Sequence, residues 1–117
     1  MTGLGDVLRS IAGRDGVTAA LLLSADGLPI EHRARGPFDP ETVAALAATL
    51  AQYGNRFGLS VQRGDLRTAV FEFASGMVVL AQVGTGDWLA VLAVPDADIG
   101  PLLSDLRHHR PALATLL

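Results

Sequence analysis

Residues 16–30 read GVTAALLLSADGLPI and contain two strand-like runs around a tight turn. The first run, Val17–Ser24, is mostly apolar and has the length of a buried strand. Residues 25–27 follow as a turn, since an Asp-Gly pair tolerates the positive φ that such turns require. The second run, Leu28–Arg33, contains Pro29, which has no N–H to donate to a neighbour. We therefore predict a β-hairpin whose second strand lies at the edge of a sheet.

A short amphipathic helix is predicted upstream of this hairpin. Its apolar residues recur at helical spacing and form one stripe: Leu4, Val7, Leu8 and Ile11. Gly13 and Gly16 are expected to end the helix, because glycine readily adopts the left-handed conformation that closes helices.

Downstream of the hairpin and the loop 34–38, the sequence predicts a long helix over residues 40–57. Asp39 is a good N-cap, Pro40 fits the first helical position, and Glu41 favours the positive end of the helix dipole. One face of this helix is expected to point inward: Val43, Leu46, Ala47, Leu50, Gly54 and Phe57. The other face is mostly small or uncharged for a solvated face, so a second helix could pack closely there: Ala45, Ala48, Thr49, Gln52 and Arg56.

Three further strands are predicted after the polar connection 58–65. They cover Leu66–Phe73, Met77–Val83 and Trp88–Val94, and short glycine-containing turns join them. The middle run is almost continuously apolar, which is typical of a strand covered on both faces.

A final helix is predicted after Pro95, with Asp96 or Asp98 as its cap and an apolar inner side made of Ile99, Leu102, Leu103 and Leu106. Pro111 should kink or restart this helix, because proline cannot donate to the preceding turn. The resulting order, α-β-β-α-β-β-β-α, predicts a single α/β domain of the α+β type over residues 1–117. We expect one five-stranded antiparallel sheet with helices on both faces.

Composition narrows the possible functions. The chain has 117 residues, of which 50% are hydrophobic, and a net charge of −3, which argues against nucleic-acid binding. It has no Cys and no Lys, which excludes a thiol nucleophile, a phosphate-binding loop of the Walker type and a Schiff-base enzyme. No signal pattern and no run of about 18 apolar residues is present, so we expect a cytoplasmic protein without membrane insertion.

No residue pattern indicates catalysis, a metal or a cofactor. His108 and His109 are adjacent on a helix and point in different directions, so favourable charge placement near the helix end explains them better than metal binding. Gly84–Gly86 fits a hairpin turn better than a phosphate loop, since no helix start follows it. Ser24, Ser60 and Ser75 lack a recognisable nucleophile elbow. We therefore expect a protein that is not an enzyme.

Several of these segments together resemble the bacterial members of the roadblock/LC7 family, which has a profilin-like fold. They are GRDGVTAALLLSADGLPIE, DPETVAALAATLA, the meander LRTAVFEF-ASGMVVLAQVG-TGDWLAVLAV, and IGPLLSDLR. The resemblance implies a homodimer in which the third strand pairs with its copy and the two central helices lie side by side. The implied dimer residues are Leu66, Arg67, Thr68, Ala69, Val70, Phe71 and Tyr53.

The resemblance also implies a partner, a Ras-like small GTPase, docked on the paired central helices. The candidate contacts are Ala45, Ala48, Thr49, Gln52 and Arg56. The function it implies is a regulator or scaffold, with or without stimulation of GTP hydrolysis. Arg56, Arg63 or Arg67 could act as an arginine finger, although solvated or dimer-bridging arginines are the simpler interpretation. The alternative function is a small-molecule sensor of the profilin or PAS kind, with Thr18, Thr68 and Gln82 as its inward polar groups.

Overall fold

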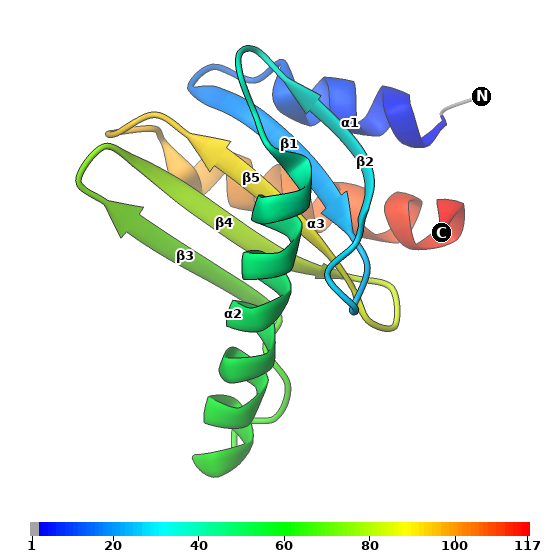
Figure 1. Ribbon diagram of the computed structural model, residues 1–117, viewed down its shortest axis with the longest axis vertical. Coiled ribbons are helices and arrows are strands. Elements are labelled where there is room, and N and C mark those ends of the chain that lie inside the picture. Colours follow the sequence, from blue (N-terminus) through cyan, green and yellow to red (C-terminus); the bar gives the residue numbers. More distant parts are fainter. Residues whose placement is uncertain (1–2) are drawn as a thin grey trace.

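The helices and strands occur in the predicted order in the computed structural model, which describes residues 3–117 (Figure 1). The helices are α1 (Leu4–Ala12), α2 (Pro40–Ser60) and α3 (Ile99–Leu116). The strands are β1 (Val17–Leu23), β2 (Pro29–Ala34), β3 (Thr68–Phe73), β4 (Gly76–Val83) and β5 (Asp87–Ala93). They form one five-stranded sheet in the order β2-β1-β5-β4-β3, and each neighbouring pair is antiparallel. The predicted α+β fold class is confirmed.

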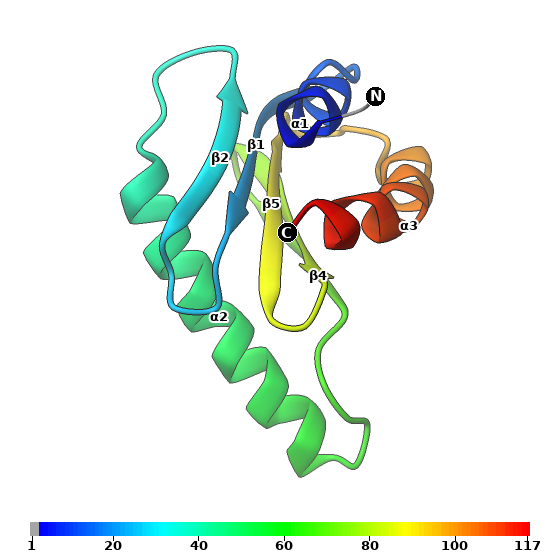
Figure 2. The ribbon, with the colours of Figure 1, turned by 90° about the vertical axis from the view of Figure 1, so that its right-hand side faces the viewer.

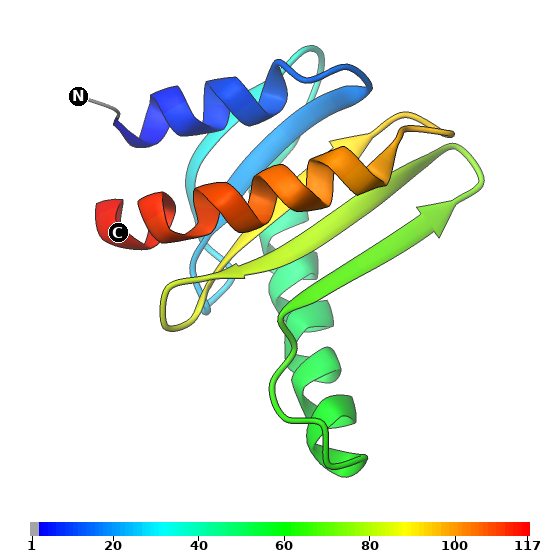
Figure 3. The same ribbon diagram turned by 180° about the vertical axis from the view of Figure 1, so that it is seen from behind.

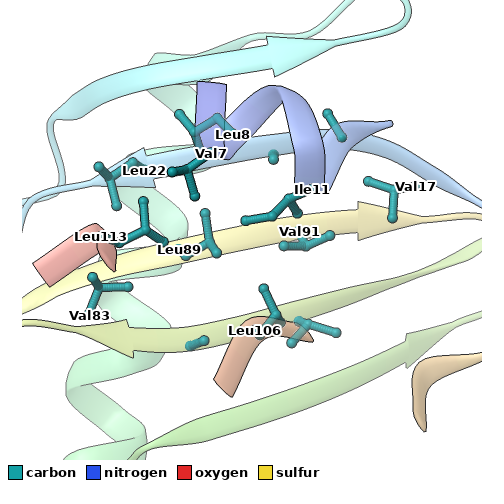
Figure 4. Close-up of a cluster of buried hydrophobic side chains, with 14 of the residues drawn as sticks. Val7, Leu8, Ile11, Val17, Leu22, Val83, Leu89, Val91, Leu106 and Leu113 are labelled. Carbon is teal, nitrogen blue, oxygen red and sulfur yellow. The ribbon is translucent and has the colours of Figure 1, made fainter. Parts of the chain in front are cut away.

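Helices cover both faces of the sheet, as predicted. Figures 2 and 3 show α1 and α3 on one face and α2 on the other. The larger hydrophobic cluster lies beneath α1 and α3, where Val7, Leu8 and Ile11 of α1 meet Leu106 and Leu113 of α3 (Figure 4). Their side chains are buried against the inward residues of β1, β4 and β5. The predicted inner stripe of α1 is therefore confirmed.

The hairpin of β1 and β2 has the predicted turn and the predicted edge position. Gly27 has φ +84°, the left-handed conformation expected of the Asp-Gly turn. Ser24 closes the turn, because its Oγ accepts a hydrogen bond from the Leu28 N–H at 3.2 Å. Pro29 lies opposite Leu23, where the register shifts, and β2 forms one edge of the sheet.

The second cluster lies between the sheet and α2, and it corrects the prediction of the inner face of this helix. Small residues face the sheet, and four of them are buried: Ala44, Ala47, Ala48 and Ala51. Leu46, Leu50 and Phe57, which were expected to point inward, are exposed. The physical reason is the short distance between α2 and the sheet. Alanine side chains allow the helix backbone to approach the sheet and the hairpin closely, and larger side chains on that face would not fit.

The ends of the three helices differ in detail from the predictions. Of the two glycines expected to end α1 in the left-handed conformation, Gly13 caps the helix with a right-handed φ of −80°, whereas Gly16 has a positive φ of +83°. α2 continues to Ser60, beyond the predicted end near Phe57. Of the two outcomes predicted at Pro111, a kink or a restart, the restart does not occur: α3 continues through Pro111 to Leu116, and Leu113 beyond the proline is buried in the core. Within residues 3–117, no helix is both long enough and apolar enough to cross a membrane.

The start of α2 provides a pH-dependent test of the fold. The Asp39 carboxylate accepts hydrogen bonds from the Thr42 hydroxyl at 2.6 Å and the Thr42 N–H at 3.3 Å. These hydrogen bonds lower the pKa of Asp39, and the bond from the hydroxyl has the larger effect. Because the folded pKa is lowered, the stabilisation is present at neutral pH and is lost as the pH falls through that pKa. We expect Asp39→Ala to lower the melting temperature at pH 7.

The matched variant for this prediction is Asp39→Asn, which keeps a capping oxygen but removes the charge. Thermal unfolding should be followed by circular dichroism from neutral pH to below about pH 4, where an ordinary carboxyl is protonated. The difference between the native chain and Asp39→Ala should shrink toward acidic pH. An unchanged difference over this range would contradict the role of the carboxylate.

Candidate functional site

Large apolar side chains form an exposed stripe along α2. They recur at steps of four, three and four residues, which places them on one side of the helix: Leu46, Leu50, Tyr53 and Phe57. Leu46 and Tyr53 are each 61% exposed and Phe57 is 70% exposed. Soluble proteins rarely leave a large contiguous apolar patch in water unless it contacts a partner.

The stripe continues into a hollow between α2 and the β3 side of the sheet. The hollow has a volume of about 210 Å³, and its walls include Leu46 and Leu50 of α2 and Phe71 and Phe73 of β3. The two phenylalanine rings stack with their centroids 6.3 Å apart, and Phe73 is largely exposed. We call the exposed stripe and these two rings the apolar surface; its residues are Leu46, Leu50, Tyr53, Phe57, Phe71 and Phe73.

The apolar surface adjoins an open sheet edge. Within the described residues, β3 pairs with β4 alone and is the end strand of the sheet, so it has the free edge that pairing with its copy would require. An edge strand presents unpaired N–H and C=O groups that favour pairing with another strand. Val70 in the middle of β3 is exposed.

The first two proposed dimer residues precede this strand, which begins at Thr68 instead of the predicted Leu66. The Leu66 N–H donates to Asn55 Oδ1 at 2.7 Å, which ties the chain to α2. The Leu66 side chain also lies against Gly54, where an added Cβ would be only 2.6 Å from Leu66 Cδ2. Leu66 therefore contributes to holding the C-terminal half of α2, which projects beyond the sheet (Figure 1).

A second exposed stripe runs beside the apolar one, and it contains four of the five candidate GTPase contacts. These residues also recur at steps of four, three and four, and each is exposed: Ala45, Thr49, Gln52 and Arg56. We call them the polar stripe. The two stripes adjoin at Arg56, whose guanidinium carbon lies 5.8 Å from the centroid of the Tyr53 ring.

Ala48, the fifth candidate contact, is not available to a partner. It is only 5% exposed, because the turn of the β1–β2 hairpin covers it. A Cβ added at Gly27 would lie 3.3 Å from Ala48 Cβ. Sequence reasoning placed Ala48 on the outer face because alanine occurs on both sides of this helix, and its apolar character does not distinguish them.

The remaining candidates for chemistry are in ordinary structural positions. The Ser60 hydroxyl donates to the Phe57 carbonyl at 2.8 Å. His108 and His109 lie edge to face on α3, with centroids 5.8 Å apart. Arg56 lies on the polar stripe, whereas Arg63 and Arg67 line a separate concavity with residues of α3. Within residues 3–117, no group of three or more His, Cys, Asp or Glu side chains could hold a metal ion.

Comparison with known proteins identifies the family. The model of the Roadblock/LC7 domain matches residues 4–93, so this chain belongs to the roadblock/LC7 family. A Roadblock/LC7 domain from Streptomyces avermitilis is 31% identical, with a TM-score of 0.82 over 96% of this chain and 98% of that one. No curated protein sequence matches the chain significantly.

Two bacterial proteins share the fold at lower sequence identity. MglB from Myxococcus xanthus is 14% identical and superposes with a TM-score of 0.88 over 96% of this chain and 92% of that one. The gliding protein MglB from Thermus thermophilus is 18% identical, with a TM-score of 0.87 over 99% and 93% of the two chains. At these identities the likeness establishes the common fold.

Proposed function

We propose that this chain is a non-catalytic regulatory module that forms a homodimer and docks a Ras-like small GTPase on its paired α2 helices. The exposed apolar surface between α2 and β3 is the observation that carries the proposal. It lies where the family resemblance implies a second copy of the chain. The polar stripe beside it then supplies the contacts to the GTPase.

A second copy is a physically suitable cover for the apolar surface. A two-fold dimer uses the same surface on both subunits. The apolar stripe of α2 can therefore pack on the same stripe of the second subunit, and the open edge of β3 can pair with the second β3. The proposed contacts in the strand and helix are Thr68, Ala69, Val70, Phe71 and Tyr53, with Leu66 and Arg67 at the start of the strand. Stable interfaces of this kind typically bury about 1,200 Å² or more in total.

The polar stripe is suited to a regulated partner rather than to a permanent one. It is rotated by about 100° from the apolar stripe, because adjacent residues of an α-helix differ by that angle. Helices that pair through their apolar stripes therefore leave their polar stripes beside the seam, accessible to a third protein. Thr49, Gln52 and Arg56 offer hydrogen-bonding and charged groups that give specificity and association rate.

The sensor alternative has less support. The apolar hollow, at about 210 Å³, is smaller than the roughly 300–1,000 Å³ of typical small-molecule sites. The three polar groups considered for a sensor do not line this hollow; Thr18 and Thr68 line two other concavities, of about 300 and 460 Å³. The Thr18 hydroxyl instead donates to the Leu92 carbonyl at 3.2 Å, and Thr68 Oγ1 accepts from Arg110 at 3.0 Å.

The docking proposal is tested by charge reversal on the polar stripe. The protein is immobilised and exposed to lysate of its source loaded with GDP or a non-hydrolysable GTP analogue, and the captured GTPase is then purified. We expect Arg56→Glu to weaken binding of that GTPase by at least about fivefold, because interface positions that matter cost more than about 1 kcal/mol on substitution. Gln52→Glu should weaken it in the same direction.

Arg35→Glu is the matched control, because Arg35 is also exposed but follows β2, away from the polar stripe. It should leave the affinity unchanged. The docking proposal is wrong if Arg56→Glu and Gln52→Glu bind the GTPase as the native chain does. Single-turnover hydrolysis with the purified GTPase then separates an activator from a scaffold, because only an activator binds the transition state more tightly than the ground state.

A further inference from the structure

Four arginines meet in a concavity beside the proposed dimer contacts, and of the four only Arg67 is among those contacts. The concavity has a volume of about 460 Å³ and lies where the loop between α2 and β3 approaches α3. Arg63 and Arg67 come from the loop, and Arg107 and Arg110 come from α3, some forty residues later in the chain. The helices α2 and α3 cover opposite faces of the sheet (Figure 2). The four side chains meet because the loop after α2 approaches α3 in the folded chain.

The positive charge of the concavity is not neutralised by the chain itself. Among the residues that line it, Asp65 carries the one negative charge, so three positive charges remain in excess. Within residues 3–117, the ion pairs of the protein involve other arginines, namely Arg9, Arg14 and Arg33. The Arg63 guanidinium makes two long contacts, at 3.5 Å, with the backbone carbonyls of Val61 and Gln62.

Arg110 shows that this crowding has a free-energy cost. Its Nη2 donates to Thr68 Oγ1 at 3.0 Å, but its buried Nε has no hydrogen-bond partner among residues 3–117. Burial, followed by the charges of Arg67 and Arg107, lowers the pKa of Arg110. Buried polar groups in native proteins are nearly always paired, so an incompletely paired guanidinium among like charges requires an explanation. A bound anion would stabilise all of these charges at once.

We propose that this concavity is a binding site for a ligand that carries two or more phosphate groups. One phosphate monoester has a charge of about −1.5 to −2 at neutral pH, so two are needed to balance three positive charges. The planar guanidinium groups of arginine suit this chemistry, because they donate paired hydrogen bonds to phosphate oxygens. The volume of the concavity lies within the usual range for small-ligand sites.

The site does not depend on the proposed GTPase partner. Arg107 and Arg110 belong to α3, whereas the polar stripe belongs to α2. Loss of phosphate binding and loss of GTPase binding are therefore separable by their variants. Arg107→Gln should leave GTPase capture unchanged, and Arg56→Glu should leave phosphate binding unchanged.

The test is calorimetric titration of the purified full chain with inorganic pyrophosphate. We expect saturable binding that Arg107→Gln weakens by about tenfold or more, the usual effect of losing a hydrogen bond to a charged group. Arg107 is exposed, so its replacement should not affect folding. Arg110→Gln serves as the second variant, with melting curves as a check. Arg35→Gln removes the same charge elsewhere and should bind pyrophosphate normally.

A second arm distinguishes a free ligand from a lipid headgroup. Phosphatidylcholine vesicles with and without phosphatidylinositol bisphosphate are sedimented with each variant. Sedimentation that requires both the bisphosphate lipid and Arg107, together with pyrophosphate binding, assigns the site to a headgroup. Pyrophosphate binding without sedimentation assigns it to a free phosphate ligand. Absence of saturable pyrophosphate binding, or equal weakening by Arg35→Gln, would overturn the proposal.

Discussion

Replacing Leu50 with aspartate should convert the proposed dimer to monomers. Leu50 lies in the middle of the exposed stripe of α2 and lines the hollow beside β3. Each subunit of a two-fold dimer would carry the substitution, so the interface would bury two unpaired carboxylates. An unpaired buried charge costs about 3–5 kcal/mol, so the dissociation constant should rise at least about a thousandfold. Size-exclusion chromatography with light scattering measures the change directly.

Leu116→Asp is the matched control for this experiment. Leu116 is 39% exposed and Leu50 is 42% exposed, so the two substitutions cost the isolated chain about the same. Leu116 lies at the end of α3, away from α2 and β3. The Leu116→Asp protein should stay dimeric and should melt like the native chain. A Leu50→Asp protein that remains a dimer would remove the apolar surface from the proposed interface.

Replacing Gly27 with valine should destabilise the isolated fold strongly. Gly27 has φ +84°, which costs an L-residue about 1–2 kcal/mol. An added Cβ would also lie 3.3 Å from both Ala45 Cα and Ala48 Cβ, so the hairpin would be pushed away from α2. Such overpacking typically costs about 1–3 kcal/mol. Together these effects should lower the melting temperature by on the order of 10 °C.

Gly36→Val provides the comparison for Gly27→Val. Nothing lies within 4 Å of a Cβ built at Gly36, and its φ is not in the left-handed region. The Gly36→Val protein should therefore have nearly the same melting temperature as the native chain. Both temperatures are measured by thermal unfolding at matched protein concentration. Equal melting temperatures for Gly27→Val and the native protein would show that the hairpin turn does not constrain α2.

The sequence predicted the order and type of the elements well, because local signals are strong here. The Asp-Gly turn places φ +84° at Gly27, and Pro29 marks an edge strand, as the structure confirms. Asp39 caps α2 as expected. Each of these signals depends on one or two adjacent residues, so neighbouring structure does not change its meaning.

The inner face of α2 was predicted correctly at Val43 and Ala47 but wrongly at Leu46, Leu50 and Phe57, because two apolar stripes run along the helix. One consists of large residues such as Leu46 and Phe57, and the other of alanines such as Ala44 and Ala51. Hydrophobicity favours burying the large residues, whereas the structure buries the small ones. Gly54 and Gly58 continue the alanine stripe and were the available signal, since glycine in a helix often marks a close approach; at Gly58 an added Cβ would meet the Gly64 carbonyl.

One candidate site could be predicted from local sequence patterns and the other could not. The polar stripe follows from helical spacing, so four of the five candidate GTPase contacts are exposed together, whereas Ala48 is buried. The arginine concavity could not be predicted, because Arg63 and Arg67 meet Arg107 and Arg110 only after the loop has folded toward α3. No local pattern links residues that are so far apart in the chain.

By itself, the sequence determined the strand and helix order, the turn at Gly27, the edge position of β2 and the membership of a known fold family. Hydrogen-bonding capacity, backbone freedom and periodicity decide these features, and they are properties of short segments. Only the tertiary structure decided which face of α2 is covered and which arginines lie together. Those outcomes depend on how closely two elements approach, and the volumes of side chains on both partners set that distance.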